Sequence, residues 1–502
     1  MKLIKQNTLW FSTLLLIVFI NLSSIAFTQS DKTIKTGSKK FTENVILSEI
    51  VTQLARSNNV NSIHIRELGG TRILWNALLK GEIDIYPDYT GTIIEEILAD
   101  ENVTYKNLKD KLSKHGIGIV YPLGFNNTYA IGMKTEEAEK SGIEEISDLR
   151  KHPNLKFGFT NEFMDRKDGW RGLQKFYNLP HSNVNGMDHD IAYRGLASSS
   201  IDVIDLYSTD AEINYYNLKV LKDDLHYFTY YQAVLLYRKD LEKTFPKVID
   251  AIKKLKNSIP ESLMIKMNSE VKINGKSEEE VAAQFIKNKF SIESNYVEST
   301  FLRRLWHNTK EHLYLVLISL SAAILVSIPL GISSYKNKKL GRFIIGITGI
   351  IQTVPSLALL VFMIPLLGIG SSPAIVALFL YSLLPIVRNT FTGLEDIPTS
   401  IKESAIVLGL SSFVILKKIE LPLASRSILA GIKTSAVINV GTATLGALIG
   451  AGGYGQPILT GIRLDSVPLI LEGAVPAALL ALIVQWMFDL SEKVIVPKGL
   501  RI

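Results

Sequence analysis

Apolar, nearly uncharged runs dominate residues 311–490 of this 502-residue chain, whereas residues 31–310 are rich in Lys, Glu, Asp and Asn. Five runs are long enough to cross a hydrocarbon core of about 30 Å as helices, which rise about 1.5 Å per residue. The predicted spans are residues 313–333, 343–367, 373–391, 428–450 and 468–489. The chain therefore predicts a water-exposed domain followed by an all-α polytopic membrane domain at residues 313–490.

Positive charge predicts how these spans are oriented. The connections after the first and third spans hold most of the Lys and Arg residues of this half, so we expect both in the cytoplasm. The same rule puts residues 31–300 outside and the tail, residues 491–502, inside. Pro355 and Pro365 could split the second span, which would raise the count to six.

Residues 301–312 are expected to form a linker between the two domains. Arg303, Arg304 and Lys310 lie there, on the outer side of the first span, against the positive-inside rule. An amphipathic helix lying along the membrane surface would accommodate them.

Residues 1–30 have the order of a secretory signal. Lys2 and Lys5 precede an apolar run from Leu9 to Leu22, and the small-residue sequence Ser24-Ile25-Ala26 follows. The alternative is an uncleaved anchor helix, for which the run is short. Both interpretations place residue 31 onward outside the membrane.

Strand-like and helix-like segments alternate through residues 31–300, which indicates an α/β domain. Expected strands lie at residues 33–36, 63–68, 83–86, 129–133, 156–160, 203–206 and 233–237. We expect two lobes, because the last strand can return to the first part of the domain. Lobe I would contain residues 31–133 and 233–300, and lobe II residues 134–232.

Composition argues against several other classes. The chain has no cysteine, so it forms no disulfide and no thiolate metal site. Its 8 histidines are scattered, and the nearest grouping, His181 with His189, lacks metal-ligand spacing. The net charge of +7 is dispersed rather than gathered into a nucleic-acid stripe. Neither a GxxxxGK[ST] phosphate loop nor a catalytic dyad is found, so we expect no enzyme activity and no cofactor in this chain.

The loop at residues 398–422 carries the most specific motif. It reads Glu403-Ser404-Ala405, then Gly409, then Ile419, Leu421 and Pro422, and two short helices are expected on either side of Gly409. This spacing resembles the coupling loop of MetI-like ABC importer permeases. The resemblance implies a separate cytoplasmic ABC ATPase, which uses ATP and Mg²⁺, and a place in a bacterial cytoplasmic membrane. An ordinary helical hairpin is the alternative. Because one chain carries only one set of about five spans, we expect a permease homodimer.

Residues 33–290 resemble a second family. The matching strings are Gly37 to Glu43, Glu67 to Thr71, Asp84 to Thr92, Glu162-Phe163 with Arg166 and Asp168-Gly169, and Tyr207 to Asp210. They are similar to the binding proteins of osmoprotectant importers, which capture glycine betaine, choline, carnitine and related quaternary amines. This likeness implies a two-lobed, type II periplasmic-binding-protein fold.

A quaternary ammonium has no N–H to donate, so aromatic faces are its usual partners, at about 0.5–2 kcal/mol per ring. From the family's aromatic box, the resemblance implies that Tyr89, Tyr129, Tyr207 and Tyr231 form the cage. Arg166 is the candidate partner of a ligand carboxylate, with polar support from Thr42, Thr71 and Thr90. The tyrosines could instead simply pack, and Arg166 could pair with Asp168 or Glu162.

We therefore expect a fused binding-protein and permease subunit of an ATP-driven ABC importer for such amines. One alternative is an importer of ergothioneine, since the Glu162-Phe163, Arg166, Asp168-Gly169 pattern also resembles fused importers of that betaine. A ligand-gated channel or sensor could use the same parts, but it would need no coupling loop.

Overall fold

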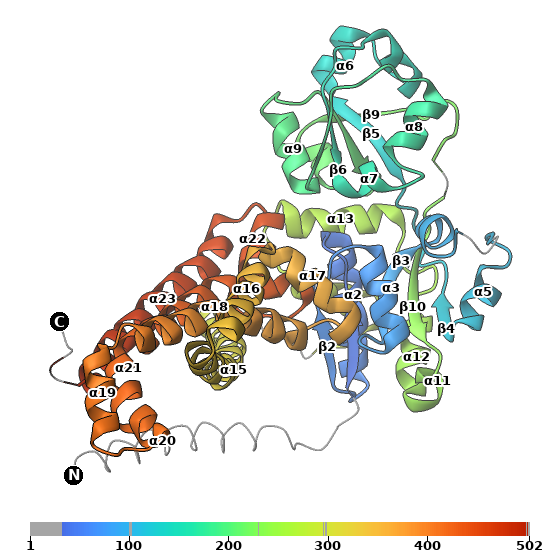
Figure 1. Cartoon of the computed structure of the whole chain (residues 1–502). Helices are drawn as coiled ribbons and strands as arrows, with labels where there is room; N and C mark the ends of the chain where they lie inside the picture. Colours follow the sequence, from blue (N-terminus) through green and yellow to red (C-terminus); the bar gives the residue numbers. More distant parts are fainter. Residues whose placement is uncertain are drawn as a thin grey trace.

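The computed structural model describes residues 33–99, 103–228, 230–294, 296, 299–497 and 499. Two lobes, each built around a β-sheet, stand beside an elongated helical domain (Figure 1). The predicted signal or anchor at residues 1–30 lies outside the described residues. The α/β binding domain followed by an all-α domain confirms the expected fold class.

Lobe I is built on a five-stranded sheet in the order β2-β1-β3-β10-β4. Its strands are β1 (Ile34–Gly37), β2 (Ser62–Ile65), β3 (Ile85–Tyr89), β4 (Ile117–Val120) and β10 (Ala233–Arg238). Its helices are α2 (Thr42–Ser57), α3 (Thr71–Lys80), α4 (Thr90–Thr92), η1 (Ile93–Ile97), α5 (Leu108–Lys114), α11 (Leu241–Thr244), α12 (Pro246–Lys253), α13 (Glu261–Lys272) and α14 (Glu278–Phe290). Helix α2 is buried from Thr42 to Ala55, because strands contact one side of it and α12, α13 and α14 the other.

Lobe II contains a second five-stranded sheet, in the order β7-β6-β8-β5-β9. Its strands are β5 (Tyr129–Lys134), β6 (Phe157–Thr160), β7 (Val184–Met187), β8 (Val203–Tyr207) and β9 (Leu218–Leu221). Its helices are α6 (Thr135–Ser141), η3 (Ile146–Lys151), α7 (Asn161–Asp165), α8 (Trp170–Tyr177), α9 (His189–Ala197) and α10 (Glu212–Tyr215).

The predicted boundary between the lobes was wrong at its first crossing. Residues 129–133 were assigned to lobe I, but β5 pairs antiparallel with β8 and β9 in the sheet of lobe II. The chain crosses earlier, where Asn126 bridges to Gln232 and its Oδ1 accepts from Tyr231 N at 2.7 Å. Residues 233–237 lie in the sheet of lobe I, where β10 pairs with β3.

The helical domain consists of α15 (Phe301–Lys336), α16 (Lys338–Thr353), α17 (Ser356–Leu367), α18 (Ser371–Glu395), α19 (Thr399–Val407), α20 (Ser412–Ile415), η4 (Leu416–Glu420), α21 (Leu421–Thr442), η5 (Ala443–Ile449), α22 (Gly455–Arg463) and α23 (Val467–Ile495). By length and composition, 4 segments of the described chain could cross a membrane, or up to 5 if the bent pair of α16 and α17 counts as one. That pair bends by 99° at Pro355, because proline cannot continue the hydrogen-bond ladder.

Residues 301–312 are not a linker, because they form the first turns of α15. A helix of 36 residues is about 54 Å long, so its first part extends beyond a hydrocarbon core of about 30 Å. The expected surface-lying helix is therefore replaced by a continuation of the first span. Arg304 pairs through Nε and Nη2 with the Glu472 carboxylate at 2.8 and 2.9 Å.

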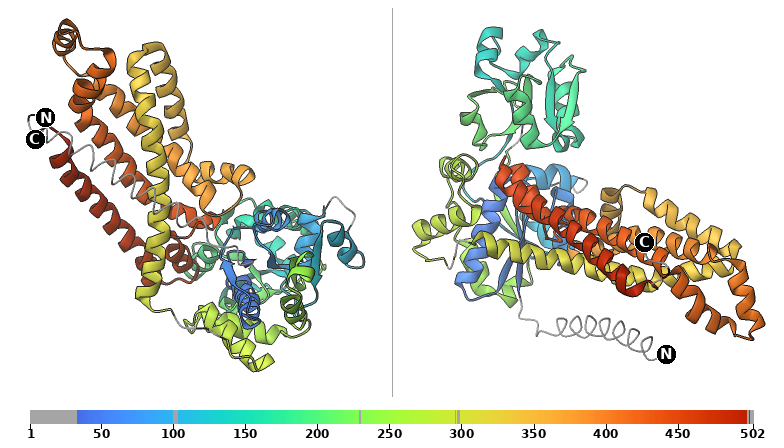
Figure 2. Two further views of the ribbon diagram at one scale, coloured as in Figure 1. Left: turned by 90° about the horizontal axis from the view of Figure 1, so that it is seen from below. Right: turned by 90° about the vertical axis from the view of Figure 1, so that its left-hand side faces the viewer.

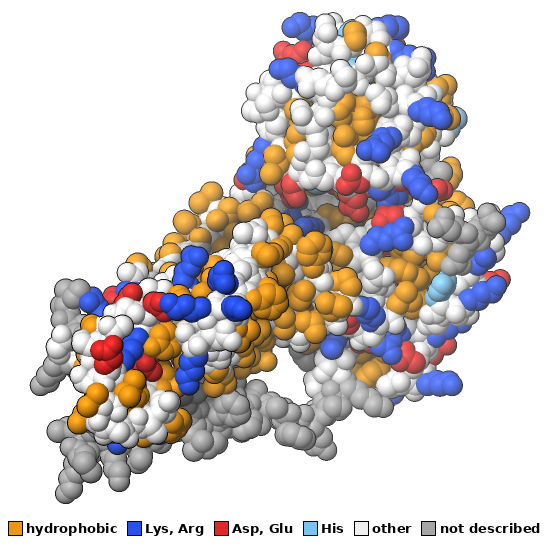
Figure 3. Space-filling view, viewed as in Figure 1, with side chains coloured by type: hydrophobic (Ala, Val, Ile, Leu, Met, Phe, Trp, Pro, Cys, Tyr) orange, Lys and Arg blue, Asp and Glu red, His pale blue; other side chains and the backbone are white. Residues whose placement is uncertain are grey.

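Helices α19 and α20 lie at the end of the helical domain farthest from the binding domain (Figures 1 and 2). Hydrophobic side chains cover the middle of the helical domain, and Lys and Arg side chains gather near its far end (Figure 3). This distribution matches a membrane-crossing bundle that has the binding domain on one side and the α19–α20 pair on the other.

Candidate ligand-binding site

Aromatic rings of lobe II and of its connection back to lobe I meet around Tyr129, at the start of β5. Its ring centroid lies 5.1 Å from that of Tyr207, at the end of β8, and 5.8 Å from that of Tyr231, just before β10. Phe163 of α7 and Phe228 complete the group at 5.0 and 6.5 Å. We call these five rings the aromatic cage. Their faces present the negative quadrupole that attracts a cation.

Tyr89 reaches the aromatic cage through another ring, that of Phe41. The Phe41 centroid lies 6.1 Å from that of Tyr89 and 5.4 Å from that of Tyr207. Tyr89 donates its hydroxyl to Glu43 Oε1 at 2.5 Å. Burial raises the pKa of Tyr89, Tyr129 and Tyr207 well above the usual tyrosine range, so their phenols stay neutral.

Arg166 is bound to two acidic side chains. Its Nε and Nη2 donate to the Asp168 carboxylate at 2.7 and 2.5 Å, and its Nη1 donates to Glu96 Oε2 at 2.9 Å. Asp168 also accepts from the Tyr231 hydroxyl. Because Glu96 belongs to lobe I and Arg166 to lobe II, this pair ties the lobes together. The guanidinium also lies over the Tyr129 ring, with Cζ 5.6 Å from the centroid.

The three candidate threonines lie around the aromatic cage rather than in it. Thr42 Oγ1 accepts from Arg463 Nη1 of the helical domain at 2.8 Å. Thr71 accepts from Lys39 Nζ at 3.0 Å, and Thr90 bonds to the backbone of Tyr230 and Gln232.

Sequence reasoning missed Phe41, Phe163, Phe228, Glu43 and Glu96 as members of the site. Phe41, Glu43 and Phe163 stand inside the matching strings, so their types were a usable signal. Phe228 and Glu96 carry no such signal, because only the folded chain brings them to Tyr129 and Arg166.

A polar pocket adjoins the aromatic cage between the lobes, and we call it the lobe pocket. Phe41, Glu43, Asn127, His189, Asn268 and Lys272 line it, among others. Burial raises the pKa of Glu43 above its usual value, against hydrogen bonds from Thr209, Tyr89, Asn127 and Asn268. Lys272 crosses the lobe boundary, since its Nζ contacts Asp190 and lies 2.9 Å from Glu212 Oε1.

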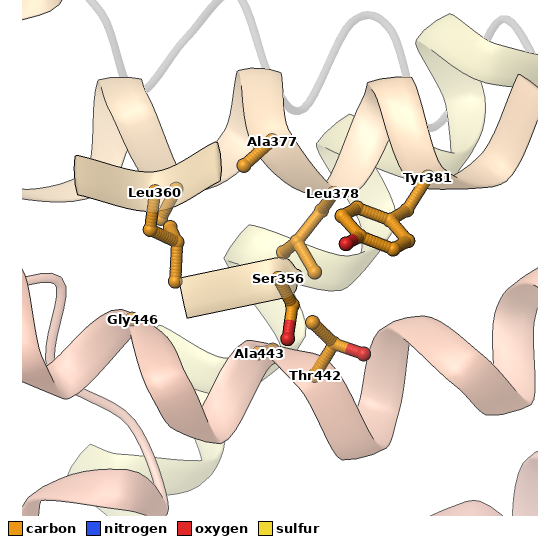
Figure 4. Close-up of a pocket in the computed structure, with 9 residues that line it drawn as sticks. Ser356, Leu360, Ala377, Leu378, Tyr381, Thr442, Ala443 and Gly446 are labelled. Atoms are coloured by element: carbon orange, nitrogen blue, oxygen red, sulfur yellow. The ribbon is translucent and has the colours of Figure 1, made fainter. Parts of the chain in front are cut away.

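A second pocket lies within the helical domain. Ser356, Tyr381 and Thr442 are the hydroxyl-bearing residues among the small and aliphatic ones that line it (Figure 4). Tyr381 donates its hydroxyl to the Val354 carbonyl. None of the residues that line this pocket is charged. Among the described residues, no group of His, Asp and Glu could hold a metal ion.

The binding domain docks on the helical domain through Arg463, at the end of α22. Arg463 donates to Glu67 Oε1 at 2.7 Å and to Glu278 Oε1 at 2.5 Å, and its side chain is only 5% exposed. Burial alone raises the pKa of Glu278, but Arg463 and Arg66 lower it to about 2. Lobe II makes its own contact, because Arg194 Nη2 lies 2.5 Å from Asp465 Oδ1.

The predicted coupling loop forms a helix pair, α19 and α20, with Gly409 at φ +72° between them. Glu403 and Ser404 are exposed and Ala405 is buried, while Ile419, Leu421 and Pro422 are partly buried where η4 leads into α21. Val407, Leu408 and Phe413 are 87%, 76% and 69% exposed, which leaves an apolar surface at this end of the molecule.

These parts are those of a solute-binding protein and of a membrane permease, joined in one chain. Residues 32–288 match the family of the substrate binding domain of ABC-type glycine betaine transport systems. Residues 323–498 match the binding-protein-dependent transport system inner membrane component.

Curated proteins match each part. The chain is 44% identical over 206 residues to a glycine betaine/carnitine/choline transport system permease protein, OpuCB of Bacillus subtilis, covering 40% of this chain and 95% of that protein. It is 32% identical over 294 residues to EgtU of Helicobacter pylori, an ergothioneine transport permease/ergothioneine binding protein, covering 56% of this chain and 53% of that protein. A crystal structure of a glycine betaine/carnitine/choline ABC transporter matches with a TM-score of 0.45 and 30% identity, over 52% of this chain and 99% of that one.

The chain belongs to the family of ABC importers of the glycine betaine, choline and carnitine type, as a fused binding protein and permease. It is a multi-pass protein of the inner membrane, and its families are those of a transporter rather than of an enzyme.

Proposed function

We propose that this chain captures a quaternary amine in the aromatic cage, on the outer side of the membrane, and passes it through its own permease domain. The observation that carries the proposal is the aromatic cage itself, in which Tyr129, Tyr207 and Tyr231 meet at the junction of the lobes. A ligand held by these rings together with Phe41 of lobe I, which lies 5.4 Å from Tyr207, would stabilise the closed arrangement of the lobes.

A cytoplasmic ABC ATPase would supply the energy. The exposed apolar pair α19 and α20 is the docking surface that we assign to it, with Glu403, Ser404, Ala405, Gly409, Ile419, Leu421 and Pro422 as the coupling residues. Tyr335 of α15 donates to Glu420 Oε1 at 3.0 Å, and Glu420 belongs to η4, which follows α20, so a movement of the helix pair would be transmitted through η4 to α15. Because one chain supplies one set of spans, two copies would form the pore.

Ergothioneine is the second candidate ligand. The similarity to EgtU, which also joins permease and binding protein in one chain, favours it. Ergothioneine carries a trimethylated ammonium, so it would use the same aromatic cage.

Calorimetry on the purified full-length chain tests the proposal. We expect saturable binding of at least one compound among glycine betaine, choline, carnitine and ergothioneine. Accumulation of that compound in vesicles should require a co-reconstituted ATPase and ATP. Ligand-induced currents without an ATPase would instead indicate a channel, and no saturable binding would refute the assigned ligand class.

A further inference from the structure

Two buried amide oxygens in the lobe pocket have no hydrogen-bond partner within the part of the chain that the structure describes. They are Oδ1 of Asn127 and Oδ1 of Asn268. Both residues line the lobe pocket, and each is only 4% exposed. A buried carbonyl oxygen without a donor is destabilising, so these atoms are suited to a donor that the protein itself does not supply.

Glu43 sets the orientation of both amides. Asn127 Nδ2 donates to Glu43 Oε1 at 2.8 Å, while Asn268 Nδ2 donates to the Thr209 carbonyl at 2.9 Å and to Glu43 Oε2 at 3.3 Å. The Thr209 carbonyl only accepts hydrogen bonds, so the Asn268 amide nitrogen must face it. The Asn127 amide nitrogen donates to the same Glu43 oxygen that accepts from the Tyr89 hydroxyl. The two Oδ1 atoms therefore remain available as acceptors.

Two residues that line the lobe pocket contact the aromatic cage. Phe41 lines the pocket and lies 5.4 Å from Tyr207, centroid to centroid, and the ring of His189 is 4.8 Å from that of Tyr207. A short ligand could therefore place its ammonium among the rings and its other end beside the amides. His189 Nδ1 is a further buried atom of this lining without a partner in the described chain.

The charges around the lobe pocket favour a cation. Its carboxylates belong to Glu43, Asp190, Asp210 and Glu212, and its cationic side chains are Lys272 and His189. Even with His189 protonated, the negative charges outnumber the positive ones. Arg166 is engaged by Asp168 and Glu96, so a ligand carboxylate would displace an existing ion pair or remain unpaired.

We infer that the lobe pocket binds a hydrogen-bond-donating group of the ligand. The substrate is then a cationic quaternary amine with a hydroxyl group, of the choline type, rather than a betaine whose polar end is a carboxylate. The hydroxyl donates to Asn127 or Asn268 while the ammonium lies in the aromatic cage. This inference rests on the proposed function, because it assigns the ammonium to the cage.

Calorimetry on the full-length chain with four compounds tests the inference. They are choline, n-propyltrimethylammonium, glycine betaine and tetramethylammonium. The propyl compound replaces the choline hydroxyl with a methyl group, so we expect it to bind about tenfold more weakly or worse. Equal affinity for these two, or tightest binding of glycine betaine, overturns the inference but leaves the proposed function standing. If none of the four compounds binds, the inference is overturned, and the proposed function fails as well if carnitine and ergothioneine also do not bind.

Variants of Asn127 and Asn268 test whether these two side chains cause the preference for choline. Asn268→Leu and Asn127→Leu should each reduce the preference for choline over n-propyltrimethylammonium by about tenfold, with a smaller loss of affinity for the propyl compound. Asn185→Leu, at an exposed position of β7, is the matched control and should keep the wild-type ratio. Thermal unfolding shows which variants are folded. A folded variant pair that retains the full preference contradicts the assignment.

Discussion

Arg463 of the helical domain donates through Nε to Glu67 Oε1 of lobe I at 2.7 Å, and both side chains are almost completely buried. Glu67 has φ +58°, a backbone conformation that few non-glycine residues adopt, and its carboxylate also accepts from Gln456 at 3.1 Å. The same Arg463 offers its carbonyl to Lys272 Nζ at 2.8 Å, and Lys272 bridges to lobe II. The C-terminal end of α22 therefore contacts the lobe boundary as well as lobe I.

Breaking this contact should separate docking from ligand binding. Arg463→Met leaves Glu67 and Glu278 without their shared cation, and removing one partner of a buried ion pair costs about 3–5 kcal/mol. We expect uptake to fall at least about tenfold while ligand affinity stays within about twofold. Radiolabelled uptake and calorimetry measure the two. Arg171→Met, on the exposed face of α8, should change neither, and normal uptake by Arg463→Met would contradict this role.

Removing the central ring of the aromatic cage should weaken ligand binding. Tyr129→Leu should raise the Kd by about 2- to 30-fold, the range that corresponds to about 0.5–2 kcal/mol per ring. Tyr129→Phe keeps the ring and should stay near the wild-type value. Tyr215, which is 63% exposed, provides the control Tyr215→Leu. Unchanged affinity in a folded Tyr129→Leu protein would place the ligand elsewhere.

The ion pair between Arg166 and Glu96 should hold the lobes together. Glu96→Gln removes the negative charge that pairs with Arg166 across the lobe boundary. We therefore expect a larger fraction of molecules with open lobes, and ligand dissociation about 5- to 30-fold faster. Because the chain has 0 cysteines, spin labels at Asp110→Cys and Glu139→Cys can report the distance between the lobes directly. Glu137→Gln on exposed α6 is the control. A distance distribution identical to the wild type would rule out this role for the pair.

Stability should depend on pH through His189. Burial alone lowers its pKa, but Asp210, Asp190 and Asp205 raise it to about 9. Since the ordinary value is about 6.5, protonated His189 stabilises the fold fully below about pH 6.5 and loses this contribution as the pH rises through 9. We expect the Tm of the binding domain to fall over that interval, and less steeply in His189→Gln. Asp205, whose pKa burial raises to about 6, acts at lower pH. Equal slopes in the two proteins would refute the assignment.

The exposed apolar surface of α19 and α20 should bind the ATPase. Val407→Asp puts a charge on a side chain that is 87% exposed, so folding should be little affected while ATPase association is lost. Co-purification measures association, and calorimetry should show unchanged ligand affinity. Val220→Asp, at a 40% exposed position of β9, is the matched control. Full ATPase retention by Val407→Asp would exclude this surface.

Strand prediction failed where local pattern is weak. The short strand β4 was missed, because it contains Gly118, a residue that is unfavourable in strands. In the fold, a side chain at Gly118 would collide with Tyr237. Packing against a residue distant in sequence therefore requires glycine at this position. The lobe boundary was misplaced for a related reason. Nothing near Tyr129 indicates that its strand pairs with β8 and β9 rather than with lobe I.

Hydropathy, charge bias and motif spacing are properties of neighbouring residues, so they were sufficient for the two-domain division, the membrane segments, and the helix pair around Gly409. Contacts between residues that are far apart in the sequence could not be predicted from these local properties. The return of the chain between the lobes places Phe228 beside Tyr129 and lets Arg166 donate a hydrogen bond to Glu96. Docking of the two domains buries Arg463 against Glu67. The two free amide oxygens of the lobe pocket also emerge only from folding, because Glu43 must reach Asn127 and Asn268 before their orientation is defined.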